Sequence, residues 1–443
     1  MTDLSAAAAT RARASRFPAT ALALLTLLTT GVAQAATAAP AADAGFNGAD
    51  TAWMLVSTVL VFLMTMPGIM LFYSGMLRKR NALSIMAQTM AAIGVITFLW
   101  AAVGYSVAFD SGTSWFGGLD KAWAAGLIGQ ATAGHPIAPH IPEAVFFLFQ
   151  MSFAIIAFAV VLGATAERMR IGATIVFAAF WLVLVYAPVA HWIWHPEGWL
   201  ARLGHLDFAG GTVVHIVAGA SGLAAAIAAG PRRGFGREPM VPHNLALTVM
   251  GAGLLWAGWF GFNAGSAFEA GQRAAGALLA TQVAAGTGAL AWGLCEMLRR
   301  QQMSVLGMAT GAIAALIAIT PASGFVGVGG ALAIGTAGAV GCFFAVTGFK
   351  AITGVDDSLD VFALHGVGGL IGTLLTPVFA LPSIVKTSGL FAVNLIGALA
   401  VMAYAAAVSF ALLKVIQFAI GLRVTEKQEI VGLDLAQHGE SAT

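Results

Sequence analysis

The chain has 443 residues, of which 59% are hydrophobic and only 9% are charged, against roughly a quarter charged in soluble domains. Its formal net charge of +2 is too small to indicate a nucleic-acid partner. The composition excludes an ordinary soluble protein, and the long apolar runs predict one bundle of helices embedded in a membrane.

The first 35 residues have the pattern of a secretory signal. Arg11, Arg13 and Arg16 precede the apolar run 19–32, which ends in the A-x-A sequence at 33–35. We predict that residues 1–35 are a signal peptide, and a retained first helix is the alternative.

Eleven apolar runs follow, each long enough to suggest a membrane span. They lie at 51–76, 82–109, 143–165, 173–190, 209–229, 245–265, 274–297, 305–320, 328–348, 359–379 and 390–419. If the first run begins outside, fourteen Lys and Arg residues fall on the inner side and four on the outer side. This bias predicts a cytoplasmic C-terminus and an N-terminus that lies outside after signal cleavage.

The fold class predicted from these runs is an all-α membrane protein. Spans 1–5 and 6–10 then have opposite orientations, as in transporters built from inverted repeats, and the last span stands apart. Residues 36–420 would form this eleven-helix domain, and residues 421–443 a charged cytoplasmic tail.

Two histidines in apolar runs carry the strongest functional signal. His215 follows Asp207 by eight residues in span 5, and His365 follows Asp357 by eight residues in span 10. Eight helical residues rise about 12 Å, so each ring is predicted to lie about 12 Å from an opposite face of a core about 30 Å thick. We expect the two rings to approach each other near the middle of the membrane, where ionisable side chains usually serve a function.

Two neutral imidazoles in line suit a small neutral hydride or a proton relay. Each ring offers one donor and one acceptor along an apolar lumen. A transition-metal site is the competing interpretation, but two histidines are a short ligand set and no Cys or Glu lies nearby at ligand spacing. We therefore expect no metal and no cofactor. Since no nucleophile elbow, phosphate loop or paired-carboxylate constellation stands out either, an enzyme is not predicted.

Aromatic side chains are predicted to converge on the outer side. Phe149 and Phe153 share one face of span 3, and Phe262 and Ser266 share one face at the end of span 6. Trp194 lies at the end of span 4. Aromatic faces with one hydroxyl acceptor can bind a compact cation through cation–π attraction.

Seven stretches in order resemble the ammonium transporter family (Amt/Mep/Rh), and in particular its bacterial Amt branch. They are PGIMLFYSGMLR, GATAERMR, DFAGGTVVH, GWFGFNAGSA, ITPASGFVGVGGA, VDDSLDVFALHGVGG and GLRVTEKQEIVGLDLAQHGE. The resemblance covers residues 51–440. It implies a homotrimer in the cytoplasmic (inner) membrane, with one substrate pathway through each subunit.

The resemblance also implies roles for the outer aromatic residues. Phe153, Trp194 and Ser266 match the family's ammonium-recruitment site. Phe153 and Phe262 match its stacked phenyl gate. Trp194 favours the transporter over the Rh branch of the family, which looks different at this position.

The remaining matches lie deeper in the chain. His215 and His365 match the family's twin-histidine pair, Asp207 the buried carboxylate that supports the outer site, and Asp357 the inner end of span 10. Met151 departs from the small residue that is more frequent in the family, and it is expected to narrow the outer vestibule.

The function implied is uptake of ammonium, and of methylammonium, across the membrane. Ammonium would be recruited outside, lose its proton at the gate and cross as ammonia along the twin histidines, with electrogenic transport if the proton follows. The tail at 421–443 and the loop at 230–244 resemble the surface on which bacterial members meet a PII-type signal protein. An Rh-like channel for neutral ammonia or carbon dioxide and an ammonium sensor are the alternatives.

Overall fold

The computed structural model describes residues 45–128, 134–386 and 389–442. The predicted signal peptide at 1–35 lies outside the described residues. In the described part of the chain, every regular element is a helix or a helical turn, and no β-strand is present. The prediction of an all-α fold is confirmed for these residues.

The helices (α) and the short 3₁₀ and π turns (η) have the following bounds in chain order: α3 (Gly48–Leu63), η1 (Met64–Ile69), α4 (Met70–Met76), η2 (Lys79–Asn81), α5 (Ala82–Leu99), η3 (Trp100–Gly104), α6 (Tyr105–Phe109), η4 (Ala122–Ala124), α7 (Glu143–Thr165), α8 (Ile171–Trp181), η5 (Leu182–Tyr186), α9 (Ala187–Trp194), α10 (Trp199–Leu203), η6 (Gly211–Ile216), α11 (Val217–Ala229), α12 (Leu245–Gly265), α13 (Gln272–Arg300), α14 (Val305–Ile319), α15 (Val328–Thr353), η7 (Phe362–Gly366), α16 (Val367–Phe379), α17 (Leu390–Ala419), α18 (Glu426–Val431) and η8 (Asp434–His438).

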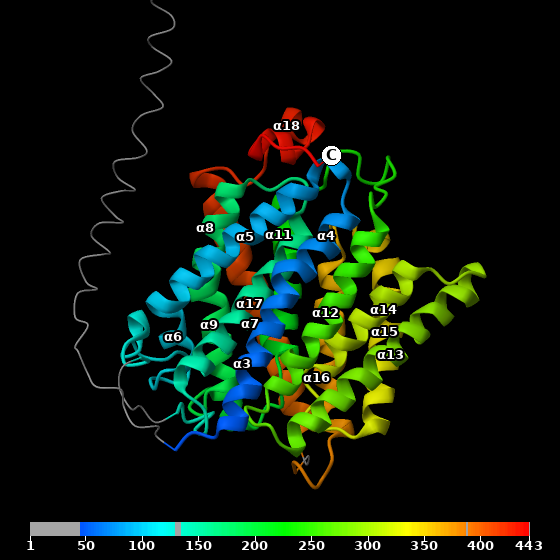
Figure 1. The fold of residues 1–443 in the computed structure, drawn as a ribbon. Coiled ribbons are helices and arrows are strands. Elements are labelled where there is room, and N and C mark those ends of the chain that lie inside the picture. Colours follow the sequence, from blue (N-terminus) through cyan, green and yellow to red (C-terminus); the bar gives the residue numbers. More distant parts are fainter. Residues whose placement is uncertain (1–44, 129–133, 387–388, 443) are drawn as a thin grey trace, which may run out of the picture. The chain divides into compact units, whose positions relative to one another are not determined.

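Ten helical stretches of the described chain are long and apolar enough to cross a membrane, and they coincide with ten of the predicted spans. The predicted span at 305–320 corresponds to α14, which has only 15 residues. Such a helix is about 22 Å long, which is shorter than a hydrocarbon core of about 30 Å. However, α3 begins at one end of the bundle and α18 lies at the other (Figure 1), which favours an odd number of crossings.

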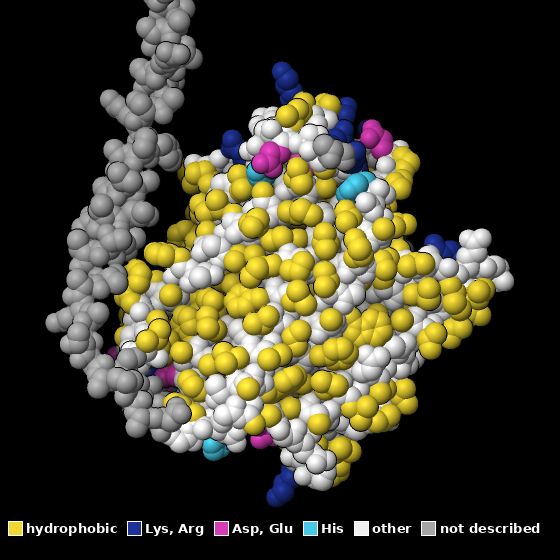
Figure 2. Space-filling view, in the orientation of Figure 1, with side chains coloured by type: hydrophobic (Ala, Val, Ile, Leu, Met, Phe, Trp, Pro, Cys, Tyr) yellow, Lys and Arg dark blue, Asp and Glu magenta, His cyan; other side chains and the backbone are white. Residues whose placement is uncertain are grey.

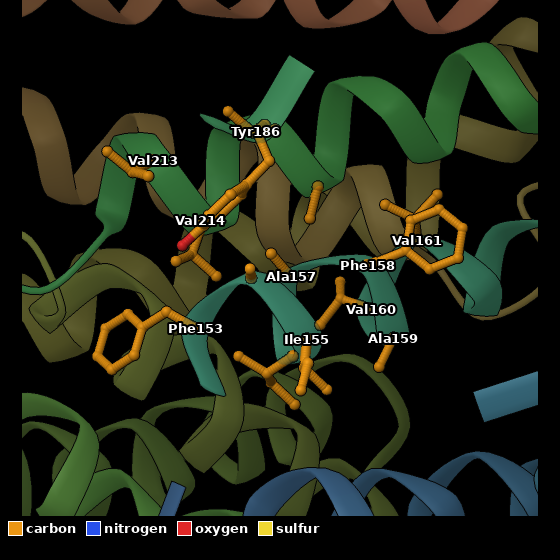
Figure 3. Packing of buried hydrophobic residues seen from close by; sticks show 14 of the residues in the cluster. Phe153, Ile155, Ala157, Phe158, Ala159, Val160, Val161, Tyr186, Val213 and Val214 are labelled. Atoms are coloured by element: carbon orange, nitrogen blue, oxygen red, sulfur yellow. The ribbon is translucent and has the colours of Figure 1, made fainter. Parts of the chain in front are cut away.

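Helix α7 forms the centre of the bundle. Its sequence is apolar around its whole circumference, which is typical of a buried helix, and nearly every residue from Glu143 to Thr165 is buried. Figure 3 shows side chains of α7 from Phe153 to Val161 packed beside Tyr186 of η5 and Val213 and Val214 of η6. This central helix therefore brings the outer aromatic residues next to the first histidine turn.

The two histidine-bearing helices cross at glycine contacts. A Cβ atom on Gly219 of α11 would collide with the backbone of Gly366 in η7. A Cβ atom on Gly369 of α16 would lie 2.8 Å from the carbonyl oxygen of Gly211 in η6. Small residues let membrane helices approach backbone to backbone, so these glycines allow η6 and η7 to lie side by side.

The surface divides by polarity along the bundle. On the face shown in Figure 2, hydrophobic side chains cover the middle, whereas most Lys, Arg, Asp and Glu side chains gather at the end occupied by α18. Many large hydrophobic residues on the outside of the bundle are exposed, such as Phe344 of α15 and Phe418 of α17. An apolar middle and charged ends are the pattern required of a membrane-spanning bundle.

The tail packs on the end of its own bundle. Thr425 and Gln428 form a capping box at the start of α18. Asp434 accepts hydrogen bonds from the backbone nitrogens of Leu83 (3.1 Å) and Ser84 (2.7 Å), and so caps the start of α5. The tail is therefore a docked element in this subunit and not merely a solvated end.

Candidate functional site

The predicted outer site assembles from three helices. Phe153 of α7 meets Trp194 at the end of α9 in an edge-on contact, with ring centroids 5.9 Å apart. Ser266 follows α12 and donates its hydroxyl proton to the carbonyl oxygen of Phe262 at 2.9 Å. Because that proton is engaged, the oxygen of Ser266 remains available as an acceptor. The three residues are spread over more than one hundred positions of the sequence. The fold brings Phe153 next to Trp194 and to Phe262, whose carbonyl oxygen binds Ser266.

Asp207 supports this arrangement from beneath. Its carboxylate accepts four backbone N–H groups at the start of η6, from Gly210 (2.9 Å), Gly211 (2.6 Å), Thr212 (2.8 Å) and Val213 (3.0 Å). Its own carbonyl oxygen accepts the indole N–H of Trp194 at 3.0 Å. Asp207 therefore binds both Trp194 and the start of the first histidine turn.

Two phenyl rings separate the outer site from the lumen. Phe153 and Phe262 stack with centroids 4.0 Å apart and an angle of 14° between their planes. Both side chains are buried. The ring centroids of Phe149 and Phe153 lie 4.8 Å apart, so Phe149 extends the aromatic cluster. Met151 is buried in α7.

The two predicted histidines meet behind the phenyl rings. The Nδ1 atoms of His215 and His365 lie 3.2 Å apart, and both side chains are buried. Since a bond between two neutral rings needs one donor and one acceptor, the two imidazoles must adopt complementary tautomers. Each ring projects from a π turn, a feature that is frequent at functional sites.

A narrow lumen runs beside the two imidazoles. The cavity has a volume of about 20 Å³, room for about one molecule the size of water. The Nε2 atom of His215 has no hydrogen-bond partner among the described residues. Apart from the imidazoles and one tyrosine, the lining is apolar: Met64, Ile69, Phe72, Tyr73, Ile156, Val160, His215, Leu255, Trp259, Phe262, Ile313, Leu359, Leu364 and His365.

The second histidine turn is capped by an aspartate, as the first is. Asp357, eight residues before His365, accepts the backbone N–H of Phe362 at 2.7 Å and so caps η7. Asp207 caps η6 in the same way, eight residues before His215. The recurrence of the Asp–His spacing therefore reflects a recurring structure, a capped π turn that presents an imidazole.

An ionic cluster lies at the end of the bundle occupied by the tail. Glu167 binds Arg78 (2.7 Å) and Arg232 (3.2 Å), and Arg232 also binds Asp356 (2.8 Å). Burial disfavours the charged carboxylates, but hydrogen bonds from Arg78 and the charge of Arg232 lower the pKa of Glu167 nonetheless. At Asp356, burial alone would raise the pKa, but the hydrogen bonds from Arg232 lower it overall. The cluster ties together the ends of α4, α7 and α11 and the segment that leads into η7.

Some contributors to the site were missed in the sequence. Trp259 stacks on His215 with centroids 5.5 Å apart and forms part of the lumen wall. Its place, three residues before Phe262 on the same helix face, was the available signal. Glu167 lies in the quoted stretch GATAERMR and Arg232 in the loop at 230–244, but a count of charges by membrane side cannot reveal which charges pair.

Comparison with known proteins identifies the relatives of this chain. The sequence model of the Ammonium Transporter Family matches residues 52–443. A putative ammonium transporter of Methanothermobacter thermautotrophicus is 43% identical over 405 residues, which cover 89% of this chain and 98% of the relative. The ammonium transporter of Bacillus subtilis is 42% identical over 402 residues, with coverage of 89% and 98%.

Solved structures share the fold. Mep2 of Candida albicans superposes with a TM-score of 0.81 at 37% identity, covering 90% of each chain. A protein described as a sensor Amt protein superposes with a TM-score of 0.82 at 29% identity, covering 88% of this chain and 98% of its own.

Proposed function

Because the chain belongs to the ammonium transporter family, we propose that it takes up ammonium across the cytoplasmic membrane. Ammonium is recruited at the outer site formed by Phe153, Trp194 and Ser266. It loses its proton at the gate formed by Phe153 and Phe262. Ammonia then passes the imidazoles of His215 and His365.

The imidazole pair carries this proposal. A small apolar lumen whose polar groups are mainly two hydrogen-bonded rings (3.2 Å) suits a compact neutral hydride better than a hydrated ion. A bare cation in a dry lumen faces a desolvation cost of many kcal/mol. The substrate must therefore leave its proton outside the lumen, and transport is electrogenic when that proton crosses separately.

The outer site supplies affinity for the charged form. The rings of Phe153 and Trp194 meet edge to face, and their π faces attract a compact cation. The oxygen of Ser266 accepts one of its N–H groups. Methylammonium is admitted by the same chemistry, and potassium, which has no proton to lose, is rejected at the gate.

The larger assembly is part of the same proposal. We place α14 among eleven spans, with the signal peptide 1–35 removed, the N-terminus outside and the tail in the cytoplasm. Three copies form a homotrimer. The tail at 421–443 and the loop at 230–244 form the surface for a PII-type partner.

An ammonium jump on a supported membrane tests the transport step. The purified protein should give a transient current with ammonium and methylammonium and none with potassium. Ser266→Ala and Trp194→Leu should each raise the half-saturating ammonium concentration by roughly threefold to thirtyfold, as expected for lost cation–π and hydrogen-bond contacts. Folded protein that gives neither current nor uptake would overturn the proposal, and a potassium current of similar size would overturn the deprotonation step.

An ammonium sensor is the second candidate. The fold neighbour described as a sensor Amt protein and the docked tail favour it. Binding of a cytoplasmic partner that responds to ammonium without any accompanying uptake would distinguish the sensor from the transporter.

A further inference from the structure

His191 makes two contacts that a neutral imidazole cannot make together. Its Nδ1 atom lies 3.1 Å from the carbonyl oxygen of Ala108, and its Nε2 atom lies 2.8 Å from the carbonyl oxygen of Thr113. The side chain is fully buried. Carbonyl oxygens only accept hydrogen bonds, and a neutral imidazole has a single N–H group. Both contacts are favourable only when the ring carries a proton on each nitrogen.

Two neighbouring histidines provide a contrast within the same cluster. The Nδ1 atom of His135 accepts the backbone N–H of Ile137 (3.2 Å), and its Nε2 atom faces the carbonyl oxygen of Phe109 (2.9 Å). The Nδ1 atom of His195 accepts a backbone N–H at 3.2 Å. A neutral ring satisfies these contacts. His191, which stacks on His195 at 4.5 Å, therefore differs from both.

Acidic and basic side chains lie in the same outer cluster as His191. Glu143 is paired with Lys121 at 2.9 Å, and Glu197 accepts a backbone N–H at 2.9 Å. His195 and Glu197, after α9, are electrostatic neighbours of His191. The other charged groups of this cluster are Asp110 and Lys121 of the outer loop, His135, Glu143 at the start of α7 and Arg202 of α10. Helices packed against α9 also carry Tyr105 of α6 and Tyr186 of η5.

His191 belongs to a row of contacts that fastens the outer loop around Trp194. Each residue of the segment 112–115 is bound by one residue of the segment 191–199. The pairs are Gly112 N with Glu197 Oε2 (2.9 Å), Thr113 O with His191 Nε2 (2.8 Å), Ser114 O with Trp199 N (3.2 Å) and Trp115 O with Trp192 Nε1 (2.7 Å). Of the three donors that segment 191–199 contributes, the imidazole is the one whose number of N–H groups depends on its protonation state.

We propose that His191 is a positioning residue of the outer site. In its doubly protonated form it binds the segment 108–113 to α9, and so holds Trp194, three residues further along the helix, edge-on to Phe153. Loss of the proton leaves one carbonyl oxygen without a donor and loosens Trp194. This inference rests on the proposed recruitment site, and it links ammonium affinity to the pH of the outer medium.

Solid-state NMR of the reconstituted full-length protein tests the protonation state directly. With ¹⁵N-labelled histidine, both ring nitrogens of His191 should carry protons near neutral pH, while His135 and His195 should each show one bare nitrogen in the same sample. The His191 signals are assigned by their contact with the ¹³C-labelled carbonyl of Thr113. A bare nitrogen on His191 at every pH between about 5 and 8, the range over which histidines ordinarily titrate, overturns the proposal.

Currents from His191→Gln test the consequence for the outer site. Glutamine keeps a donor near Nε2 and places an acceptor toward Ala108. The half-saturating ammonium concentration should rise by roughly threefold to tenfold, as for one weakened hydrogen bond with a charged donor, and should lose its dependence on outer pH. The maximal current and the amount of folded protein should remain. His135→Gln is the matched control and should keep the parent's affinity and pH profile.

The two readouts separate this inference from the proposed function. If the parent protein carried no current, the transport proposal would fail, yet the NMR measurement would still decide the state of His191. If His191→Gln did not fold, the NMR measurement on the parent would decide again. An unchanged half-saturating concentration in folded His191→Gln overturns the positioning role alone.

Discussion

Gly219 of α11 and Gly366 of η7 meet backbone against backbone, with no space for a side chain at position 219. The reciprocal contact joins Gly369 to the carbonyl oxygen of Gly211. His215 and His365 project from the turns beside these crossings. The glycine contacts therefore set the distance between the two imidazoles.

Gly219→Val should force the two pore helices apart. We expect the free energy of unfolding to fall by about 1–3 kcal/mol because the crossing becomes overpacked, and ammonium flux to fall as the imidazole pair separates. Thermal unfolding in detergent and flux in vesicles measure the two effects. Gly253→Val is the matched control, since a Cβ atom at this helical glycine meets nothing within 4 Å. Equal behaviour of the two variants would contradict the proposed role of the crossing.

Removing either imidazole should impair transport through the lumen. His215→Ala or His365→Ala leaves the Nδ1 atom of the other ring without its partner at 3.2 Å, and an unpaired buried polar group costs about 1–3 kcal/mol. We expect ammonium flux to fall on the order of tenfold, or potassium to be admitted, while the oligomer is retained in size-exclusion chromatography. His140→Ala, at an exposed position, should match the parent. Unaltered rate and selectivity in both pore variants would show that the pair is not on the substrate path.

The ionic cluster should make stability depend on acidity. Glu167 and Asp356 have folded pKa values below their usual range, so the unfolded chain binds more protons than the folded one near pH 4. Their contribution is complete above the ordinary carboxylate pKa of about 4, and it is lost as the pH falls through the lowered folded values. The free energy of unfolding, measured from about pH 7 down to about pH 3, should show this loss.

A pair of variants isolates the cluster. Glu167→Gln should cost about 3–5 kcal/mol, because it removes a partner from the buried Arg232 and from the partly buried Arg78, and should flatten the acid dependence. Glu426→Gln, which breaks an exposed pair with Arg233, should cost less than about 1 kcal/mol. A steep acid dependence that persists in Glu167→Gln would assign it to other groups.

Deleting residues 422–443 should leave the membrane bundle folded, because its spans are complete at α17. Transport should fall, and binding of a PII-type protein should be abolished. Asp434→Ala isolates the docking contact: it removes the cap of α5 and should cost about 0.5–2 kcal/mol, whereas Lys427→Ala in the exposed part of the tail should be neutral. A truncated protein that binds the PII-type partner with unchanged affinity would move the docking surface to the loop at 230–244.

Much of the fold could be predicted from the sequence because each membrane span must be an apolar helix long enough to cross the hydrocarbon core. The run at 143–165, for example, agrees with α7 at both ends. The equal Asp–His spacing also predicted that His215 and His365 would approach each other, since a rise of 1.5 Å per residue fixes the depth of each ring.

Other features depend on contacts between distant segments, which hydropathy does not encode. The polar tail suggested a solvated or docking end, but not the cap that Asp434 provides to α5, because capping is decided by tertiary position. The predicted run at 305–320 was already short, and α14 is one residue shorter still; hydropathy alone does not tell whether so short a helix crosses the membrane. The double donation by His191 depends on two carbonyl groups of a loop, and a single sequence cannot place them.

The π turns that carry the histidines also restrict how this chain can be recombined with its relatives. A π turn accommodates more residues than an α turn, so η6 and η7 set the rotational phase between the segments before and after each histidine. Loss of one residue within 211–216 or 362–366 would rotate everything downstream by about 100° and turn a lumen-facing stripe toward a neighbouring helix. The junctions of a chimaera therefore belong in exposed loops such as 236–239, and each capped turn must be exchanged whole, from its aspartate to its histidine.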